Sequence, residues 1–208
     1  MPTVTIAARK GGVGKTMTAL MTSRWLARAG RDCTLVDLDP QRGLWDCATV
    51  LGCPDGRLTR RLRLAPDGRI PQPPTARHYT IIDTPPATDG LMPGLQAADY
   101  IVVPVIPEAQ EMLALGKFLA VLDATRHERP CAKTLGVLPV RYVHHWRAHR
   151  ECLVEVGRVA ADHGIEVLDP VPHSQAVTRY SMAGGLWRSL ASRLIALEPA
   201  SQSAARAA

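Results

Sequence analysis

The sequence predicts one α/β domain, in which helices cover both faces of a mostly parallel, twisted sheet. Three observations support this fold class. The chain has 208 residues, of which 46% are hydrophobic and 21% charged, as in an ordinary globular domain. Short apolar segments rich in β-branched residues alternate with longer segments of helical composition. Strands that are apolar on both faces indicate a parallel sheet enclosed between two helical layers.

The predicted elements follow from apolar runs and from the Gly and Pro residues that bound them. The predicted strands are Thr3–Ala8, Cys33–Asp37, His78–Asp83, Tyr100–Val105, Thr134–Leu138 and Ile165–Leu168. The predicted helices are 17–29, 108–126, 145–162 and 185–197. Residues 54–77 are rich in Pro and Arg and are expected to be irregular. We expect one domain over 1–198 and a disordered tail over 199–208, which is small and polar.

Composition excludes several classes of protein. Apolar runs fall short of the ~20 residues that a membrane helix needs, and the N-terminal segment lacks the features of a secretory signal. The five cysteines are odd in number and form no C-x-x-C pair, so we expect reduced thiols in a cytoplasmic protein. The net charge of +6 is compatible with binding to nucleic acid or to an anionic membrane.

A glycine-rich loop after the first strand predicts a phosphate-binding site. Residues 9–16 read Arg-Lys-Gly-Gly-Val-Gly-Lys-Thr and connect a predicted strand to a predicted helix, as a phosphate loop requires. Glycines allow backbone N–H groups to turn toward an anion, and the helix N-terminus adds its dipole. Lys15 is expected to bridge the β- and γ-phosphates, and the Thr16 hydroxyl to bind Mg²⁺. Arg9 stands where the ordinary motif has its first glycine.

The segment Lys10-Gly-Gly-Val-Gly-Lys-Thr16 resembles the deviant Walker A motif of the ParA/MinD group of P-loop ATPases. Leu35–Gln41 and Ile81–Pro86 resemble two further segments of that group, the second being its Walker B strand. The resemblance implies a P-loop NTPase fold, ATP and Mg²⁺ as cofactors, and an ATP-dependent sandwich homodimer. Within that group, the chain most resembles small plasmid-type ParA partition proteins. The nucleotide-binding residues that it implies are Lys10, Gly11, Gly12, Val13, Gly14, Lys15, Thr16, Met17, Arg141 and Pro172.

The resemblance also assigns catalytic and metal-binding roles. It implies that Lys10 reaches the partner's phosphates across the dimer, that Asp39 activates the attacking water, and that Asp83 contacts Mg²⁺ through water. The strand pattern agrees, because Asp37 and Asp39 lie two residues apart at the carboxyl edge of the sheet, where ligands bind. For Asp37, a structural capping role and a functional role remain equally open. The segment after Asp83 is either a nucleotide-sensitive switch or a rigid turn.

Basic residues outside the loop are candidates for contact with DNA phosphates. Arg147, Arg150 and Arg179 are the first choice, and the arginines of 57–63 the second; a solvated surface is the alternative for both sets. The histidines of 144–149 suggest a metal site, but a basic helix without metal is favoured because no acidic third ligand is evident.

The leading functional hypothesis is a slow, Mg²⁺-dependent ATPase for plasmid or chromosome partition, associated with the nucleoid. Its expected partners are a second copy of itself, non-specific DNA and a small centromere-binding protein of the ParB/ParG kind, and no membrane. The alternatives are a MinD-like membrane-acting ATPase, a cargo-positioning ATPase on the nucleoid, and an iron–sulfur carrier. The last segment is poor in basic residues and no close cysteine pair is present, which disfavours the membrane and iron–sulfur alternatives.

Overall fold

The centre of the molecule is a parallel sheet. The computed structural model describes residues 2–53, 55–65, 68–71, 78–86, 88–125, 132–178 and 185–198. Within these ranges the sheet has six strands in the order β3-β2-β4-β1-β5-β6, and every neighbouring pair is parallel. The strands are β1 (Thr3–Ile6), β2 (Asp32–Asp37), β3 (Leu62–Leu64), β4 (His78–Asp83), β5 (Tyr100–Val105) and β6 (Lys133–Pro139). The predicted fold class, an α/β domain with a mostly parallel sheet, is confirmed.

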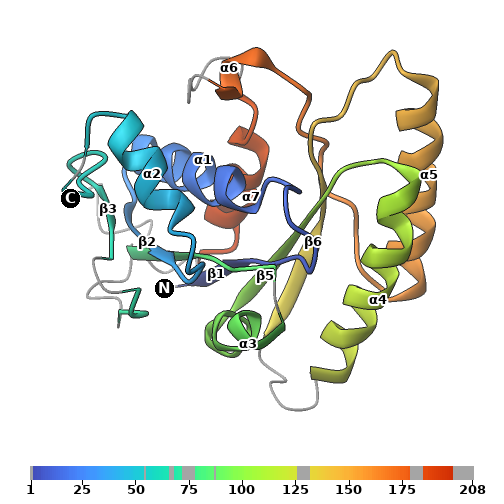
Figure 1. Cartoon of the computed structure of the whole chain (residues 1–208), viewed down its shortest axis with the longest axis horizontal. Helices are drawn as coiled ribbons and strands as arrows, with labels where there is room; N and C mark the ends of the chain where they lie inside the picture. Colours follow the sequence, from blue (N-terminus) through green and yellow to red (C-terminus); the bar gives the residue numbers. More distant parts are fainter. Residues whose placement is uncertain are drawn as a thin grey trace, which may run out of the picture.

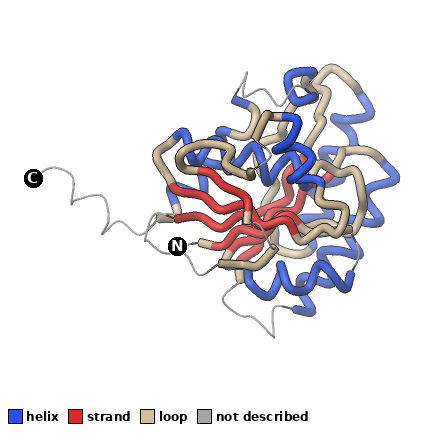
Figure 2. Tube along the Cα trace, turned by 60° about the vertical axis from the view of Figure 1, so that its left-hand side comes forward, coloured by secondary structure: helices blue, strands red, loops and turns tan. Residues whose placement is uncertain are grey.

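Helices cover both faces of this sheet, as Figures 1 and 2 show. The helices α1, α2 and α7 lie on one face, and α3, α4 and α5 on the other. Their bounds are α1 (Lys15–Arg28), α2 (Gly43–Val50), α3 (Thr88–Ala97), α4 (Ala109–Thr125), α5 (Arg147–Asp162), α6 (Gln175–Thr178) and α7 (Arg188–Ala196).

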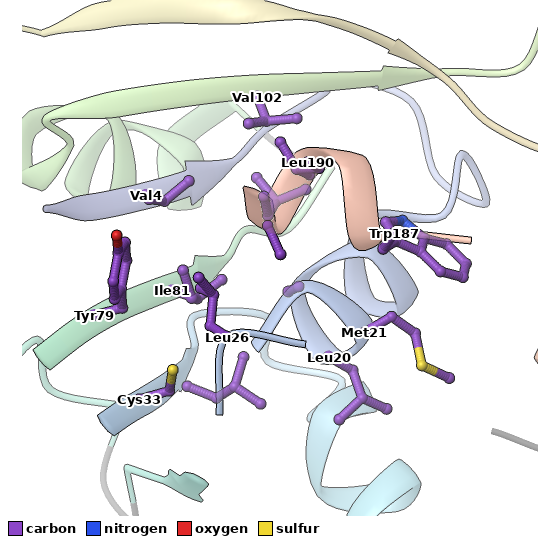
Figure 3. Packing of buried hydrophobic residues seen from close by; sticks show 14 of the residues in the cluster. Val4, Leu20, Met21, Leu26, Cys33, Tyr79, Ile81, Val102, Trp187 and Leu190 are labelled. Carbon is purple, nitrogen blue, oxygen red and sulfur yellow. The ribbon is translucent and has the colours of Figure 1, made fainter. Parts of the chain in front are cut away.

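The strands are apolar on both faces because each face packs against helices. Consecutive side chains of a strand point to opposite faces. Ile81 accordingly belongs to the core beneath α1, whereas its neighbour Ile82 lies in the core on the opposite face. Figure 3 shows Ile81 together with Leu20 and Leu26 of α1. Burying a large aliphatic side chain contributes about 1.5–3 kcal/mol, so these layers hold the sheet and α1 in a fixed relation.

Several predicted elements need correction. The segment 165–168 is not a sheet strand: it runs beside β6 and forms one isolated bridge, Val137 to Val167. The stretch predicted as irregular contains β3, which adds an edge strand to β2. The short helices α2, α3 and α6 were not predicted. Gly, Pro or Asp residues punctuate the sequences of α2 and α3, and α6 has only four residues, too few to show a helical period. The first strand ends at Ile6, and α1 begins directly at Lys15.

The register of the central strands places the candidate site. Ile6 of β1 is paired with Asp83 of β4, and Asp83 is paired with Asp37 of β2. These three residues are the last of their strands, so the carboxyl ends of β1, β2 and β4 lie side by side. The loop that follows Ile6 therefore begins beside two carboxylates. A crevice at the carboxyl edge of a parallel sheet is where ligands bind in such folds.

Candidate functional site

The loop of residues 9–14 connects β1 to α1 and has the backbone of an anion cradle. Gly12 and Gly14 have φ angles of 76° and 81°, in the left-handed region that favours glycine. Gly14 is the N-cap of α1, and its carbonyl accepts the N–H of Thr18 at 2.9 Å. A Cβ atom on Gly11 or Gly12 would meet nothing within 4 Å, so that side of the loop is open to a ligand. The N-terminus of α1 faces the same opening and favours negative charge.

Lys15 provides the buried cation of this cradle. Its side chain is 6% exposed, and its ammonium donates a hydrogen bond to the carbonyl of Lys10 at 2.8 Å. Burial lowers the pKa of Lys15, and the nearby carboxylates of Asp83 and Asp39 partly offset that effect. An ammonium in such a position is stabilised by a bound anion. Lys15 thus lies between the glycine loop and the carboxylates of Asp83 and Asp39.

Asp83 is a buried carboxylate without a hydrogen-bond donor. Both of its oxygens are enclosed and have no partner among the described residues. Burial raises the pKa of Asp83 to about 7, and the carboxylates of Asp37 and Asp39 add to that effect, whereas Thr16 and Lys15 oppose it. Because an unpaired buried carboxylate is costly, this position suits a bound cation or its water shell.

Asp37 has a capping role, which decides the alternative that the sequence left open. One oxygen accepts the N–H of Leu44, in the first turn of α2, at 2.9 Å, and the other accepts the N–H of Asp39 at 3.1 Å. Burial raises the pKa of Asp37, and these two backbone hydrogen bonds oppose the rise. Asp37 therefore fixes both the start of α2 and the backbone of Asp39.

Asp39 lies in the tight turn between β2 and α2. Its carboxylate accepts the N–H of Gln41 at 2.9 Å, and its carbonyl accepts the N–H of Arg42 at 2.9 Å. Arg42 has a φ of 54°, which is rare for a residue with a side chain, so the turn is strained. The carboxylate remains partly accessible and is close enough to Lys15 to raise its pKa.

A cavity of about 300 Å³ adjoins the glycine loop. Gly14, Met17, Arg141 and Pro172 all line it, so the structure brings together four residues that the sequence placed at the nucleotide. A parallel bridge from Tyr142 to Pro172 joins the two C-terminal segments that line it. The other lining residues are Val140, Val171, His173, Ser174, Val177 and Trp187.

Two functional residues were missed by sequence reasoning. Trp187, the N-cap residue of α7, lines the cavity and is 4% exposed, but a single tryptophan carries no spacing signal. Glu111 in the first turn of α4 forms an ion pair with Lys10. Its distance of about a hundred residues from the loop hid this contact, although a glutamate in a helix otherwise rich in apolar residues was a visible signal.

The predicted DNA-contacting residues are only partly supported. Arg147 is paired with Glu151 at 2.6 Å, and Arg150 donates to the carbonyl of His144 at 3.0 Å. Arg179 lies outside the described residues. The helix α5 holds three arginines and three acidic residues, so its formal charge is balanced. His149 accepts the N–H of Val143, and no metal-binding cluster of His, Cys, Asp and Glu occurs in the described part of the chain.

Most of the chain is similar to known nucleotide-binding proteins. The model of the CobQ/CobB/MinD/ParA nucleotide binding domain matches residues 4–186. The chain is 31% identical over 173 residues to the chromosome-partitioning ATPase Soj of Thermus thermophilus, a match that covers 67% of this chain and 69% of Soj.

Two solved structures are similar to the whole fold. Cobyrinic acid a,c-diamide synthase from Mycobacterium smegmatis, with a bound ATP analog and magnesium, superposes with a TM-score of 0.73 at 25% identity, covering 94% of both chains. A plasmid partition protein from Borrelia burgdorferi has a TM-score of 0.67 at 17% identity, covering 94% of this chain and 98% of that one, and supports the fold alone. Together with the family match, these findings show that the chain belongs to the CobQ/CobB/MinD/ParA nucleotide-binding domain family.

Proposed function

We propose that this protein is a Mg²⁺-dependent ATPase of DNA partition, which forms an ATP-sandwich dimer and binds DNA without sequence preference. One observation carries the proposal: the buried Lys15 ammonium and the buried Asp83 carboxylate lie beside one glycine loop, close enough to shift each other's pKa, and the Asp83 oxygens have no hydrogen-bond partner among the described residues. The Lys15 cation would pair with a phosphate of the ligand, and the Asp83 anion with its metal ion. The likeness to Soj supports partition as the role of that chemistry.

The residues of the cradle fit ATP and Mg²⁺. The open backbone of Gly11 and Gly12 leaves space for phosphate oxygens, and Lys15 would neutralise the β- and γ-phosphates. The Thr16 hydroxyl and the Asp83 carboxylate would hold Mg²⁺, Asp83 through water. When bound, the metal supplies charge neutralisation at the reacting phosphate. The cavity beside Met17 would take the adenine ring.

Hydrolysis would depend on Asp39 and Lys10. Asp39 is partly accessible and sits on a turn held by Asp37, so it is suited to orient a water molecule toward the phosphate. Lys10 would reach the nucleotide of the second copy and stabilise its phosphate charge. Closure of the dimer then requires Lys10 to leave its present partner, Glu111.

DNA binding and stimulation by a small centromere-binding protein complete the proposed cycle. The net charge of +6 favours contact with phosphates. Dimerisation doubles the basic surface offered to one DNA molecule, and two linked sites bind more tightly than one. Hydrolysis would therefore release the DNA by returning the protein to single copies.

A membrane-acting role is disfavoured by the packing of α7. Leu190 and Leu194 of this helix are buried against the sheet, so they are not available to insert into a lipid surface. No described helix has the length and apolar character needed to cross a bilayer. The likeness to cobyrinic acid a,c-diamide synthase makes ATP-driven amide formation the second candidate. ATP hydrolysis stimulated by DNA without any small-molecule acceptor would support partition over that candidate.

Calorimetry with ATP and Mg²⁺ tests the proposal. Lys15→Ala should abolish ATP binding, because its ammonium is the buried counter-charge of the cradle. Lys117→Ala removes an exposed lysine of α4 and is the matched control, which should bind ATP as the parent protein does. Equal ATP affinity of the Lys15→Ala variant and the parent would refute the loop assignment.

A further inference from the structure

Two adjoining grooves lie along the β3 edge of the sheet. The first has a volume of about 490 Å³ and is lined by the start of β2, the start of β4 and residues 57–63. The second, of about 470 Å³, lies between the C-terminal half of α1 and the same segment. Both are lined by Thr59, Arg60 and Arg61, so they form one continuous depression, which we call the β3 groove.

The β3 groove is strongly basic. The arginines that line it come from α1 and from residues 57–63; they are Arg24, Arg28, Arg57, Arg60, Arg61 and Arg63. Asp32 is the one acidic residue among the described residues that line the two grooves, and it is paired with Arg61 at 2.8 Å. Six positive charges and one negative charge leave a formal excess of five. The exposed side chains of Arg57, Arg60 and Arg63 form no ion pair within the described ranges.

The contrast with α5 decides which basic surface is free to bind an anion. The three arginines of α5 are matched by three acidic residues on the same helix, and Arg158 alone contacts Glu155 at 2.7 Å and Asp162 at 3.4 Å. A phosphate approaching α5 would meet as many negative as positive charges. In the β3 groove it would meet a formal excess of positive charge, including the exposed Arg57, Arg60 and Arg63, which form no ion pair within the described ranges. The structure therefore reverses the order of preference that the sequence suggested.

The β3 groove and the nucleotide cradle lie at opposite edges of the sheet. Asp32 and His78, which line the groove, are the first residues of β2 and β4, whereas Asp37 and Asp83 are the last. All strands are parallel, so the whole length of the sheet separates the two sites. The groove thus stays open when a second copy covers the nucleotide edge, and a sandwich dimer would carry two such grooves.

We propose that the β3 groove binds the phosphate backbone of duplex DNA, an inference that rests on the proposed partition function. All six cations are arginines, whose planar guanidinium groups make paired hydrogen bonds to phosphate oxygens. No Phe, Tyr or Trp side chain lines the two grooves among the described residues, and the His78 ring is buried, so an exposed platform for stacking unpaired bases is absent from this part of the structure. These features select a regular, sequence-independent polyanion.

Substitution of three arginines tests the β3 groove. The triple variant Arg57→Gln, Arg60→Gln, Arg63→Gln removes exposed side chains that have no ion pair in the described ranges, so folding should persist. Its matched control is Arg147→Gln, Arg150→Gln, Arg158→Gln, which removes the same charge from α5. Fluorescence anisotropy with two unrelated DNA duplexes, with ATP and across salt concentrations, gives the affinity and its salt dependence.

The groove variant should lose at least about tenfold in affinity for both duplexes, and its slope of log affinity against log salt should fall by about three. The α5 variant should keep the parent slope. An unchanged slope in the groove variant would overturn the proposal. A loss of DNA affinity in the α5 variant alone would overturn it as well. Polyglutamate and phosphatidylglycerol vesicles serve as other polyanionic probes. If the groove variant loses binding to either probe but retains its affinity for DNA, the groove binds an acidic protein or a lipid surface, and the proposal is wrong.

The proposed function is tested separately in the same samples. Binding of ATP is measured by calorimetry for the parent and both triple variants, which leave the cradle intact. If the groove variant binds ATP and its salt dependence of DNA affinity equals that of the parent, the groove is not the DNA site, while the proposed ATPase function still stands. Absence of ATP binding in the parent would reject the proposed function. The DNA affinities of the two triple variants would still show whether the β3 groove binds DNA.

Discussion

The Lys10 ammonium is paired with the Glu111 carboxylate of the same chain. The Lys10 side chain is 42% exposed, but that of Glu111 is 4% exposed, so the pair joins an exposed cation to a buried anion. A buried carboxylate that loses its counter-ion is costly, and here Lys10 is the cation that contacts it. In the proposed sandwich dimer, this contact would oppose the transfer of Lys10 to a second copy.

Glu111→Gln should therefore favour the ATP-dependent dimer. The amide keeps the size of the side chain but removes the charge that holds Lys10, so the variant should dimerise at several-fold lower ATP concentration than the parent. Analytical size exclusion across ATP concentrations measures this shift. Lys10→Ala should remain monomeric with ATP, and adding Glu111→Gln to it should not restore the dimer. An identical ATP dependence for Glu111→Gln and the parent would show that the pair has no such role.

Asp39→Ala should bind ATP but hydrolyse it about 10²–10⁴-fold more slowly, because the variant lacks the carboxylate that we propose orients the attacking water. The dimer should consequently accumulate, which size exclusion with ATP detects alongside a phosphate-release assay. Asp46→Ala, on the exposed side of α2, is the control and should hydrolyse ATP at the parent rate. A monomeric Asp39→Ala protein alongside a dimeric Lys10→Ala protein would contradict both assignments.

Asp37→Ala should destabilise the chain by about 1–3 kcal/mol, because two backbone N–H groups, those of Leu44 and Asp39, lose their acceptor. Urea unfolding measures the change. Asp37→Asn retains an oxygen acceptor and should recover part of the loss. Hydrolysis should fall in the alanine variant as well, since Asp39 loses the contact that positions its backbone. Unchanged unfolding of Asp37→Ala would rule out the capping role.

Stability should depend on pH through His78. Burial lowers the pKa of His78, and the nearby Arg63 adds to that effect, while its ring is hydrogen-bonded to the Thr34 hydroxyl at 2.8 Å. A base with a lowered pKa binds protons better when the chain is unfolded. The contribution of His78 to the stability of the folded chain is therefore full above about pH 6.5 and is lost as the pH falls toward its folded-state pKa. Between pH 7.5 and pH 5.5, the free energy of unfolding in urea should fall more for the parent than for His78→Gln. An equal fall in both proteins would show that His78 does not cause the pH dependence.

The sequence by itself determined the phosphate loop and the strands that flank it. Six consecutive residues, from Gly11 to Thr16, carry the loop, because the backbone freedom of glycine and the charge of Lys15 are local properties. The strands ending at Asp37 and Asp83 were predicted because both are continuous apolar runs, as in a sheet covered on two faces. The family resemblance, based on the same segments, is confirmed by the match over residues 4–186.

The tertiary structure decided what depends on distant parts of the chain. Ile165–Leu168 has the composition of a strand but forms only a single bridge, because composition does not specify a partner. The role of Asp37 depended on where Leu44 lies, and that of Lys10 on Glu111, a hundred residues away. Residues 57–63 and α5 both contain several arginines, yet α5 holds an equal number of acidic residues, and folding gathers the other set with further arginines of α1 around a groove. Net charge is additive along a chain, whereas electrostatic potential depends on which charges the fold brings together.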